Sequence, residues 1–195
     1  ILINDQPTDE IDYSGLHPSI LALEAGSRLT GDPYDLGRQV VTTIPLNQQR
    51  AVVKLLVLIA INAASRASAF SAYRADHEKY TNDQLEPLLD AFIEKHPYLE
   101  DSICTDQGIR LMNVDAQIAT HVINRFVAEG KPILPIHDSF IVVREDHDLL
   151  RQALSDACVH VVGDDIEAES RAEKEQERMA YATNWRDRAR DYFLD

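Results

Sequence analysis

The sequence predicts a mixed α/β (α+β) fold with a small antiparallel sheet and a mostly helical middle region. Two β-rich runs, at 133–136 and 140–143, flank three polar residues, which is the pattern of a hairpin with a polar tip. Residues 48–73 are apolar on most helical faces and predict one long buried helix. With 45% hydrophobic residues among 195, the chain has enough apolar side chains for a sizeable core.

The other elements follow from apolar periodicity and from capping residues. Asn47 is the expected N-cap of the long helix, and Thr81 or Asn82 is the expected N-cap of the next helix. Pro135 has no N–H to donate, so its strand is expected at a sheet edge. The remaining expected elements are a strand at 10–13, helices at 19–29, 34–41, 81–96, 113–129 and 147–162, and a charged helix at 166–195.

Charge and composition limit the classes of partner and compartment. Lys+Arg 19 against Asp+Glu 33 gives a net charge of −14, which disfavours binding of nucleic acid through bulk charge. Two cysteines are too few for a disulfide framework, so a cytoplasmic protein with reduced thiols is expected. Lys54 and Asn62 interrupt the most apolar run, which excludes a membrane span. The chain starts at Ile1 without an initiator methionine, so we expect a fragment that lacks upstream domains.

Acidic residues at two predicted strand ends are the candidate metal ligands. Asp138 lies at the hairpin tip, where a turn between buried strands holds a carboxylate rigidly, although Asp is also simply a good turn former. Asp12 ends the strand at 10–13, and Asp5 and Asp9 lie nearby. If the two strands are neighbours, Asp12 and Asp138 share a metal, because two carboxylates plus substrate phosphates are usual ligands of Mg²⁺.

Two cations on the predicted long helix are candidate phosphate ligands. Arg50 and Lys54 are four residues apart, so they lie on one helical face. The residues that follow are almost all apolar, so these two charges need an explanation. A triphosphate is one explanation, because Arg gives multidentate contacts and Lys a compact charge. Ion pairs with local acids, or side chains that reach solvent at the helix start, are the other explanation.

The order of these motifs resembles that in family A nucleic-acid polymerases, the group of bacterial DNA polymerase I-type enzymes and phage single-subunit RNA polymerases. Motif A is similar to residues 12–18 (DYSGLHP), and the motif B helix is similar to residues 47–54 (NQQRAVVK). Motif C is similar to residues 137–140 (HDSF). Residues 110–117 (RLMNVDAQ) are similar to the helix that carries Asn and Gln before motif C. The resemblance runs in order over residues 8–158.

This resemblance implies a polymerase palm, with its small antiparallel sheet and motif C hairpin, and a reduced, mostly helical fingers region. The catalytic residues implied by the resemblance would be Asp12, Asp138 and Lys54. The two aspartates would hold two Mg²⁺ ions, with Mn²⁺ as an alternative. Arg50 and Lys54 would bind the incoming triphosphate.

Nucleic-acid contacts and domain boundaries follow from the same resemblance. His137 would support the hairpin tip or contact the primer end, and Asn113 and Gln117 would face the minor groove of the template–primer. The implied divisions are palm at 1–45, reduced fingers at 46–110, palm at 111–162, and a charged C-terminal helix at 163–195.

Three positions depart from the family pattern. Asn62 stands eight residues after Lys54, where the family has Tyr, so stacking on the nascent base pair is altered. His17 stands five residues after Asp12, where the DNA enzymes have a ribose-excluding Glu, so the sugar preference is open. Both residues belong to the implied nucleotide-binding set. Ser139 replaces the third carboxylate of the DNA enzymes, as it does in the phage RNA enzymes.

We therefore expect template-directed nucleotidyl transfer by a DNA polymerase or a primase that replicates a mobile element of the kind carried by phages and plasmids. Its partners would be a nucleic-acid template or primer and an NTP or dNTP, with no membrane. Because the charge of −14 opposes a polyanion, a basic protein partner or a missing upstream domain would supply positive charge. The alternatives are an inactive polymerase-like scaffold in a replication complex and an unrelated α/β domain.

Overall fold

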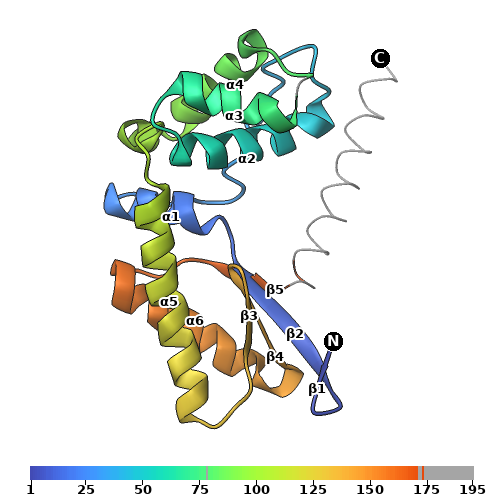
Figure 1. Cartoon of the computed structure of the whole chain (residues 1–195), viewed down its shortest axis with the longest axis vertical. Coiled ribbons are helices and arrows are strands. Elements are labelled where there is room, and N and C mark those ends of the chain that lie inside the picture. The colour runs from blue at the N-terminus through green and yellow to red at the C-terminus, as the bar shows by residue number, and fades with distance from the viewer. Residues whose placement is uncertain (78, 171–172, 174–195) are drawn as a thin grey trace. The chain divides into compact units, whose positions relative to one another are not determined.

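The computed structural model describes residues 1–77, 79–170 and 173, and the chain divides into two compact units (Figure 1). Unit 1 comprises Ile1–Leu16 and the described residues from Asp115 onward, and unit 2 comprises His17–Val114. Each unit buries apolar side chains of its own, such as Ile11 in unit 1 and Leu88 in unit 2. The palm and fingers boundaries implied by the sequence remain predictions.

Unit 1 contains a small antiparallel sheet, so the mixed α/β class expected from the sequence is confirmed. Its central strand pairs with three others, in the order β1-β2-β4-β3 with β5 also on β2. The expected strand at 10–13 is present and is longer than predicted. The strands are β1 (Leu2–Ile3), β2 (Gln6–Tyr13), β3 (Leu134–Ile136), β4 (Ser139–Val143) and β5 (Ala168–Ser170).

Alternating residues of β2 face the helical side of unit 1. Ile11 and Tyr13 are buried, and the Tyr13 hydroxyl donates to the carbonyl of Leu154 in α6 (His147–Val162) at 2.9 Å. Burial raises the pKa of Tyr13 far above its ordinary value, so the hydroxyl stays protonated and keeps donating. The helix expected at 147–162 is confirmed, and the short 3-10 turn η2 (Arg144–Asp146) joins it to β4.

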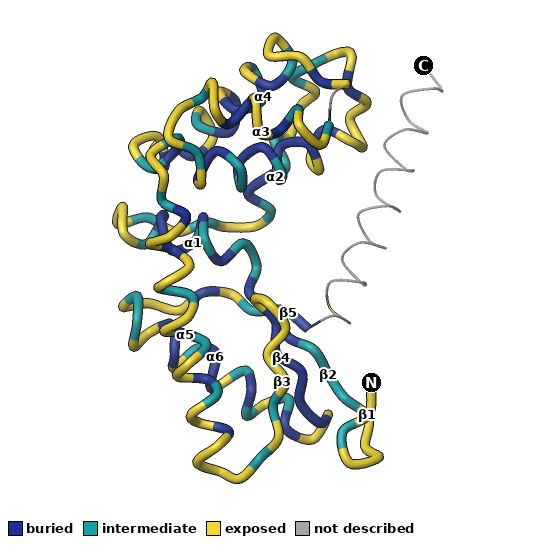
Figure 2. The backbone as a smooth tube through the Cα atoms, in the orientation of Figure 1, coloured by how far each residue is buried: buried dark blue, intermediate teal, exposed yellow. Residues whose placement is uncertain are grey.

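The predicted hairpin is present, with a shorter tip than expected. Ile136 pairs with Ser139, so Ser139 is the first residue of β4 and not part of the tip. All of β4 is buried, whereas all of β3 is exposed (Figure 2). Pro135 lies in β3 at the end of the strand order, which confirms the expected edge position.

Unit 2 is helical, and apolar side chains of its second and fourth helices form much of its core. Thr81 is the N-cap of α4, so the first of the two expected caps is correct. The long helix α5 begins five residues earlier than predicted and continues from unit 2 into unit 1. The helices are α1 (Leu16–Glu24), α2 (Leu46–Asn62), α3 (Arg66–Asp76), α4 (Asn82–Lys95), the 3-10 turn η1 (Pro97–Ser102) and α5 (Gly108–Ala128).

The single long helix predicted at 48–73 is wrong, because α2 and α3 are separate helices. Backbone N–H groups at 104, 106 and 107 donate to carbonyls at the end of α2, so these carbonyls are satisfied without a further helical turn. Ser65 then begins α3 with a capping box that involves Ser68. The predicted cap at Asn47 is also wrong, since α2 starts at Leu46 after Pro45.

Side chains replace helical hydrogen bonds at 34–41, where the predicted short helix is absent. The buried Gln49 accepts from the Val40 N–H at 2.8 Å and donates to the Arg38 carbonyl at 2.8 Å. Gly37 adopts a left-handed φ of 67°, and its N–H is bound by Asp35. These contacts satisfy backbone N–H and C=O groups of an irregular loop without helical hydrogen bonds.

Two further elements differ from prediction at their ends. The helix expected at 19–29 runs from Leu16 to Glu24 and is followed by Gly26 at a φ of 69°. The charged helix expected at 166–195 is wrong at Ala168–Ser170, which form strand β5. Residues 166 and 167 of that expected helix are not helical either, and residues 171–172 and 174–195 lie outside the described part of the chain. No helix in the described ranges has the length and apolar character needed to cross a membrane.

Candidate active site

Strand pairing brings together the two aspartates that the sequence singled out. In the register of β2 and β4, Asp12 lies opposite Ser139, and Asp138 is the residue immediately before Ser139. Asp138 is therefore one residue away from direct pairing with Asp12, at the turn that leads from β3 into β4. Both residues belong to unit 1, so their proximity follows from backbone hydrogen bonding within one unit.

The hairpin turn holds Asp138 in a constrained backbone. His137 and Asp138 form a two-residue loop, and His137 has a φ of 56°. A positive φ at only the first loop position is typical of a type II′ turn, which usually places Gly there. A non-glycine residue in such a region costs about 1–3 kcal/mol, and this kind of strain is concentrated at functional sites.

The sheet face that carries Asp12 also carries other polar side chains. Directly paired residues on antiparallel strands share a face, so Asp12 lies between Ser139 of β4 and Glu169 of β5. The Ser139 hydroxyl lies 3.0 Å from both Glu10 Oε1 and the Ile136 carbonyl oxygen, two acceptors that share its single proton.

Sequence reasoning missed Glu10 and Glu169 as neighbours of Asp12. Residues 166–169 alternate apolar and acidic side chains, which is the period of a strand and was a usable signal for β5. Glu10 was inside the predicted strand, but its contact with Ser139 depends on the register between β2 and β4.

The donor set beside the hairpin suits Mg²⁺ or Mn²⁺. Asp12 and Asp138 offer hard carboxylate oxygens, which these ions prefer. Within the described ranges, no group of three or more His, Cys, Asp or Glu side chains is arranged to hold a metal ion. An ion at Asp12 and Asp138 would therefore take its other ligands from water and substrate oxygens, as Mg²⁺ usually does.

The structure also distinguishes Asp12 from the two other N-terminal acids. Asp9 lies opposite Val142, and its carboxylate is 2.6 Å from Nδ1 of His147 at the start of α6. Asp5 lies in the turn between β1 and β2 with a φ of 62°. Asp12 is therefore the acid of the three that is placed beside the hairpin turn.

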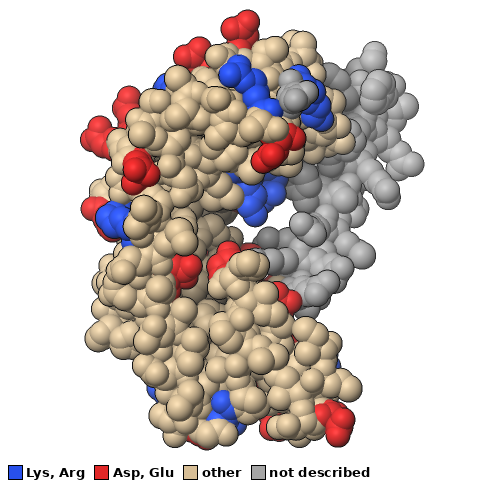
Figure 3. All heavy atoms as spheres, in the orientation of Figure 1, with Lys and Arg blue, Asp and Glu red and all other residues tan. Residues whose placement is uncertain are grey.

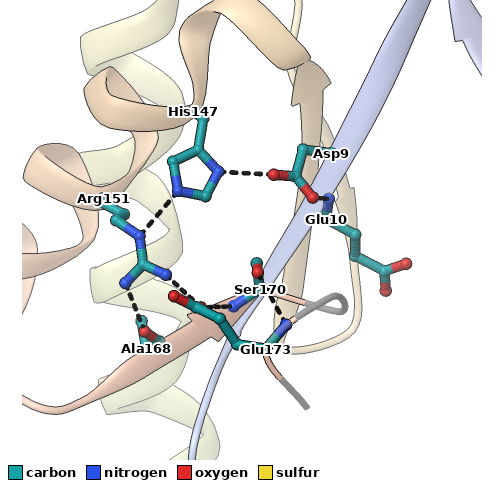
Figure 4. Close-up of polar contacts among 7 residues, drawn as sticks. All are labelled: Asp9, Glu10, His147, Arg151, Ala168, Ser170 and Glu173. Atoms are coloured by element: carbon teal, nitrogen blue, oxygen red, sulfur yellow. Dashed lines mark hydrogen bonds and ion pairs between the residues drawn. The ribbon is translucent and has the colours of Figure 1, made fainter. Parts of the chain in front are cut away.

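A chain of polar contacts fastens β5 and α6 to the sheet (Figure 4). Arg151 Nε donates to His147 Nε2 at 2.9 Å, and another Arg151 nitrogen donates to the Ala168 carbonyl at 3.0 Å. Arg151 also pairs with Glu173, which accepts from the Ser170 N–H at 2.7 Å. The Ser170 N–H bond, followed by the Arg151 charge, lowers the pKa of Glu173. These contacts hold β5, and so keep Glu169 opposite Asp12.

An open cavity of about 630 Å³ lies between α6 and the segment that leads into β5. Among the described residues, its lining includes Asp148, Asp165, Glu167 and Glu169, with Arg151 as the one cation.

In unit 2, the two predicted triphosphate ligands lie exposed on α2. Arg50 pairs with Asp32, and Lys54 Nζ lies 5.9 Å from the ring centroid of Tyr34. Figure 3 shows Lys and Arg side chains of this unit in separate groups, with Asp and Glu side chains between them. Arg50 thus has a local counter-ion, as the alternative interpretation of the sequence expected, whereas Lys54 faces an aromatic ring.

The loop that carries Asp32 is held by the end of α4. Lys95 Nζ donates to the backbone carbonyls of Asp32 at 2.8 Å and Asp35 at 2.6 Å. His96 is buried, and its Nε2 lies 3.0 Å from the Pro33 carbonyl oxygen. Three carbonyls of one loop are therefore bound by two adjacent side chains, which fixes Asp32 where it meets Arg50.

Tyr34 of the same loop is buried against Phe92, at 6.4 Å between ring centroids. Burial raises the pKa of Tyr34 to about 12, with a smaller contribution from the nearby Asp32 charge. The ring beside Lys54 is therefore neutral. Within the part of the chain that the structure describes, the buried Tyr34 hydroxyl has no hydrogen-bond partner.

The other predicted nucleotide-binding residues also lie in unit 2. Asn62 ends α2, and its Nδ2 donates back to the Leu58 carbonyl at 2.6 Å. Its Oδ1 is so close to Gly108 that a Cβ at this glycine would lie 2.0 Å from it. Asn62 is thereby fixed between α2 and the start of α5, and His17 is a partly buried residue in the first turn of α1.

The predicted nucleic-acid-binding residues are all exposed. Asn113 and Gln117 lie one turn apart on one face of α5, and His137 lies at the hairpin tip. The structure therefore places Asp12, Asp138 and His137 together in unit 1, and Arg50 and Lys54 together in unit 2.

Comparisons with known proteins find similarity among solved structures. No protein-family model matches the sequence, and no curated protein matches it. Among solved structures, the chain is similar to the POL domain of Pol1 from M. smegmatis, in complex with DNA primer-template and dNTP. The similarity has 13% sequence identity and a TM-score of 0.49, and it covers 87% of this chain and 40% of that chain. We therefore base the proposed function on the placement of the residues.

Proposed function

We propose that this chain carries out template-directed nucleotidyl transfer, as a DNA polymerase or a primer-synthesising polymerase that serves the replication of a mobile element. The pairing of β2 with β4 carries the proposal, because it sets Asp12 beside the turn that bears Asp138. A two-metal site requires carboxylates that converge from rigid elements, and a strand end and a tight turn are such elements.

Asp12 and Asp138 are the residues that hold the metal ions. Mg²⁺ or Mn²⁺ bound there supplies the positive charge that activates a 3′-hydroxyl and stabilises the departing pyrophosphate. The 3′-hydroxyl gives its proton to solvent, its oxygen bonds to the α-phosphorus of the nucleotide, and the bond from that phosphorus to pyrophosphate breaks.

The proposal assigns the triphosphate to α2 of unit 2. Arg50 and Lys54 bind its phosphate oxygens, and Lys54 stabilises the charge that develops on pyrophosphate. Arg50 must exchange its contact with Asp32 for a phosphate. His17 and Asn62 contact the nucleotide.

Contacts with the template–primer are assigned to His137, Asn113 and Gln117. The net charge of −14 opposes binding of a polyanion, so a basic protein partner or a further domain provides most of the positive surface. The activity belongs in the cytoplasm, with NTP or dNTP as the substrate.

The test is incorporation of labelled nucleotide. The chain is incubated with Mg²⁺ or Mn²⁺, single-stranded template with or without primer, and labelled NTPs or dNTPs in separate reactions. We expect incorporation that Asp138→Asn abolishes. The matched control is Asp101→Asn, which removes the same charge from an exposed residue of η1 and should leave incorporation unchanged.

The second candidate is an inactive polymerase-like scaffold in a replication complex. The Arg50–Asp32 ion pair and the acidic net charge favour it, since both oppose binding of phosphates. No incorporation by the unaltered chain in any of these reactions, together with no triphosphate binding, would support the scaffold and reject the polymerase.

A further inference from the structure

Two histidines from different helices of unit 1 lie in contact on its surface. The imidazole rings of His121 in α5 and His160 in α6 have centroids 4.1 Å apart, with a 45° angle between their planes. Both residues are exposed, so the ring nitrogens are open to solutes. Neither histidine has a role in the proposed nucleotidyl transfer.

A second contact between the same two helices shows that α5 and α6 run antiparallel here. One turn further along α5, Arg125 lies 3.9 Å from Asp156, which is one turn before His160 on α6. The contacts therefore run in opposite directions along the two helices, which neighbour each other in Figure 1. Side chains on two successive turns of α5 thus meet side chains on two successive turns of α6.

The chemistry of two adjacent neutral imidazoles points to a transition metal. Imidazole nitrogen is a good ligand for Zn²⁺, Ni²⁺ and Cu²⁺, and Cu²⁺ is bound most strongly of these by nitrogen sites. A shared metal ion would use one nitrogen lone pair from each ring. We propose that His121 and His160 form a surface site for a divalent transition metal that links α5 to α6.

This site is chemically distinct from the candidate magnesium site. Its ligands are two nitrogens, and hard ions such as Mg²⁺ prefer oxygen ligands. The described residues offer no third His, Cys, Asp or Glu in a ligating arrangement, so water completes the coordination. Ligation requires that one nitrogen of each ring face the same ion, at about 2.0–2.1 Å for Zn²⁺.

A bound ion should stabilise unit 1, because it joins two helices in the folded state alone. A ligand that binds only the native state stabilises it by RT ln(1 + L/Kd), where L is the free ligand concentration, so the melting temperature rises with the logarithm of ligand concentration above Kd. Binding should also weaken at acidic pH, because metal ligation requires neutral imidazole.

The experiment uses Cu²⁺ and Zn²⁺ salts with the full chain, without nucleotide or nucleic acid. Electron paramagnetic resonance of added Cu²⁺ reports nitrogen ligands, and thermal melts with Zn²⁺ report stabilisation. The variants are His121→Gln and His160→Gln, which keep polar side chains at exposed positions. The matched control is His77→Gln, at the C-terminal end of α3 in unit 2. Circular dichroism of each variant checks that it is folded.

The expected result is one tightly bound Cu²⁺ with a two-nitrogen signature, and a Zn²⁺-dependent rise in melting temperature. Loss of a second-shell partner alone typically weakens metal binding 10–100-fold, so each ligand variant should weaken it by at least about 10-fold. His77→Gln should bind as the unaltered chain does. Equal binding by the unaltered chain, His121→Gln and His160→Gln would overturn the proposal, as would the absence of binding by the unaltered chain. Asp138→Asn should bind Cu²⁺ and Zn²⁺ as the unaltered chain does, so the metal-binding result does not depend on whether the proposed polymerase activity is found.

Discussion

The two units position their candidate residues by different means. In unit 1, the places of Asp12 and Asp138 follow from backbone hydrogen bonds between β2 and β4 and from a two-residue turn. The backbone ladder does not depend on either carboxylate. A change of Asp to Asn at these positions should therefore alter the chemistry and leave the geometry in place.

In unit 2, side chains decide what the candidate residues face. Arg50 is an exposed residue of α2, and its partner Asp32 lies on a loop held by Lys95 and His96. Each of these contacts is lost with a single side chain. Unit 1 therefore fixes the positions of its candidate residues through the backbone, whereas in unit 2 a side-chain contact decides whether the candidate Arg50 is available.

The largest expected effect tests the backbone-defined site. Asp12→Asn should lower nucleotide incorporation at least about 10³-fold, because a metal ligand that contributes several kcal/mol to transition-state stabilisation is lost. The far-ultraviolet circular dichroism and the urea midpoint should remain close to those of the unaltered chain. Incorporation is measured with Mg²⁺, template and primer.

Asp5→Asn is the matched control for this change. It removes one carboxylate from the turn before β2 and should change incorporation less than about threefold, as expected for a surface substitution away from the site. If Asp5→Asn and Asp12→Asn reduce incorporation equally, the register argument for Asp12 is wrong.

Much of unit 1 could be predicted because its signals are local. Two β-rich runs around a polar tip predict a hairpin, and Pro135 predicts the edge. The position of Asp12 beside Asp138 needed the order of the motifs as well, since strand neighbours are far apart in the sequence. Strand β5 was missed because acidic residues around Ala168 resemble a solvated helix face.

Unit 2 was predicted less well because tertiary contacts override its periodicity. The apolar pattern of residues 48–73 predicts one helix. In the structure, however, backbone N–H groups of the loop at 104–107 bind the carbonyls that would otherwise accept helical hydrogen bonds beyond Asn62. The buried Gln49 likewise binds backbone groups of the loop at 34–41, for which the sequence predicts a helix. An ion pair between Arg50 and a local acid was among the alternatives, but Asp32 could not be chosen as the partner without the loop geometry.

The second prediction tests whether Asp32 limits the availability of Arg50. Asp32→Asn should strengthen binding of a triphosphate analogue about threefold to tenfold, because an exposed ion pair contributes up to about 1 kcal/mol and the competing charge is removed. Fluorescence titration with a labelled analogue measures this change. Asp101→Asn removes an equal charge elsewhere in unit 2 and should leave the affinity unchanged. An unchanged affinity in Asp32→Asn would show that Arg50 does not bind phosphate.

The third prediction concerns His96, which helps to hold the Asp32 loop. Burial lowers the pKa of His96 below its ordinary value, so the unfolded chain binds a proton more readily than the folded chain. Its stabilising effect is therefore present above the ordinary histidine pKa and is lost as the pH falls through the folded value. The free energy of unfolding should decline there by up to about 1.4 kcal/mol per pH unit.

Urea unfolding at pH 7.5, 6.5 and 5.5 tests this dependence. His96→Gln should have a flatter pH profile than the unaltered chain, because the titrating group is gone. His77→Gln, which removes a less buried histidine of the same unit, should keep the original slope. Identical slopes for His96→Gln and the unaltered chain would assign the pH dependence to other groups.

The smallest expected effect tests the strain in the hairpin turn of unit 1. At a φ of 56°, His137 occupies a conformation that glycine adopts without steric cost. His137→Gly relieves that strain but also gives the unfolded chain more freedom, so stability should rise by no more than about 1 kcal/mol. Asp138→Gly, at the second turn position without a positive φ, gains no relief and should lower stability by about 0.5–1 kcal/mol. Shifts of the urea midpoint in opposite directions for the two variants would show that the strain lies in the backbone of His137, which positions Asp138. Equal losses of stability would show that the strain does not lie at His137.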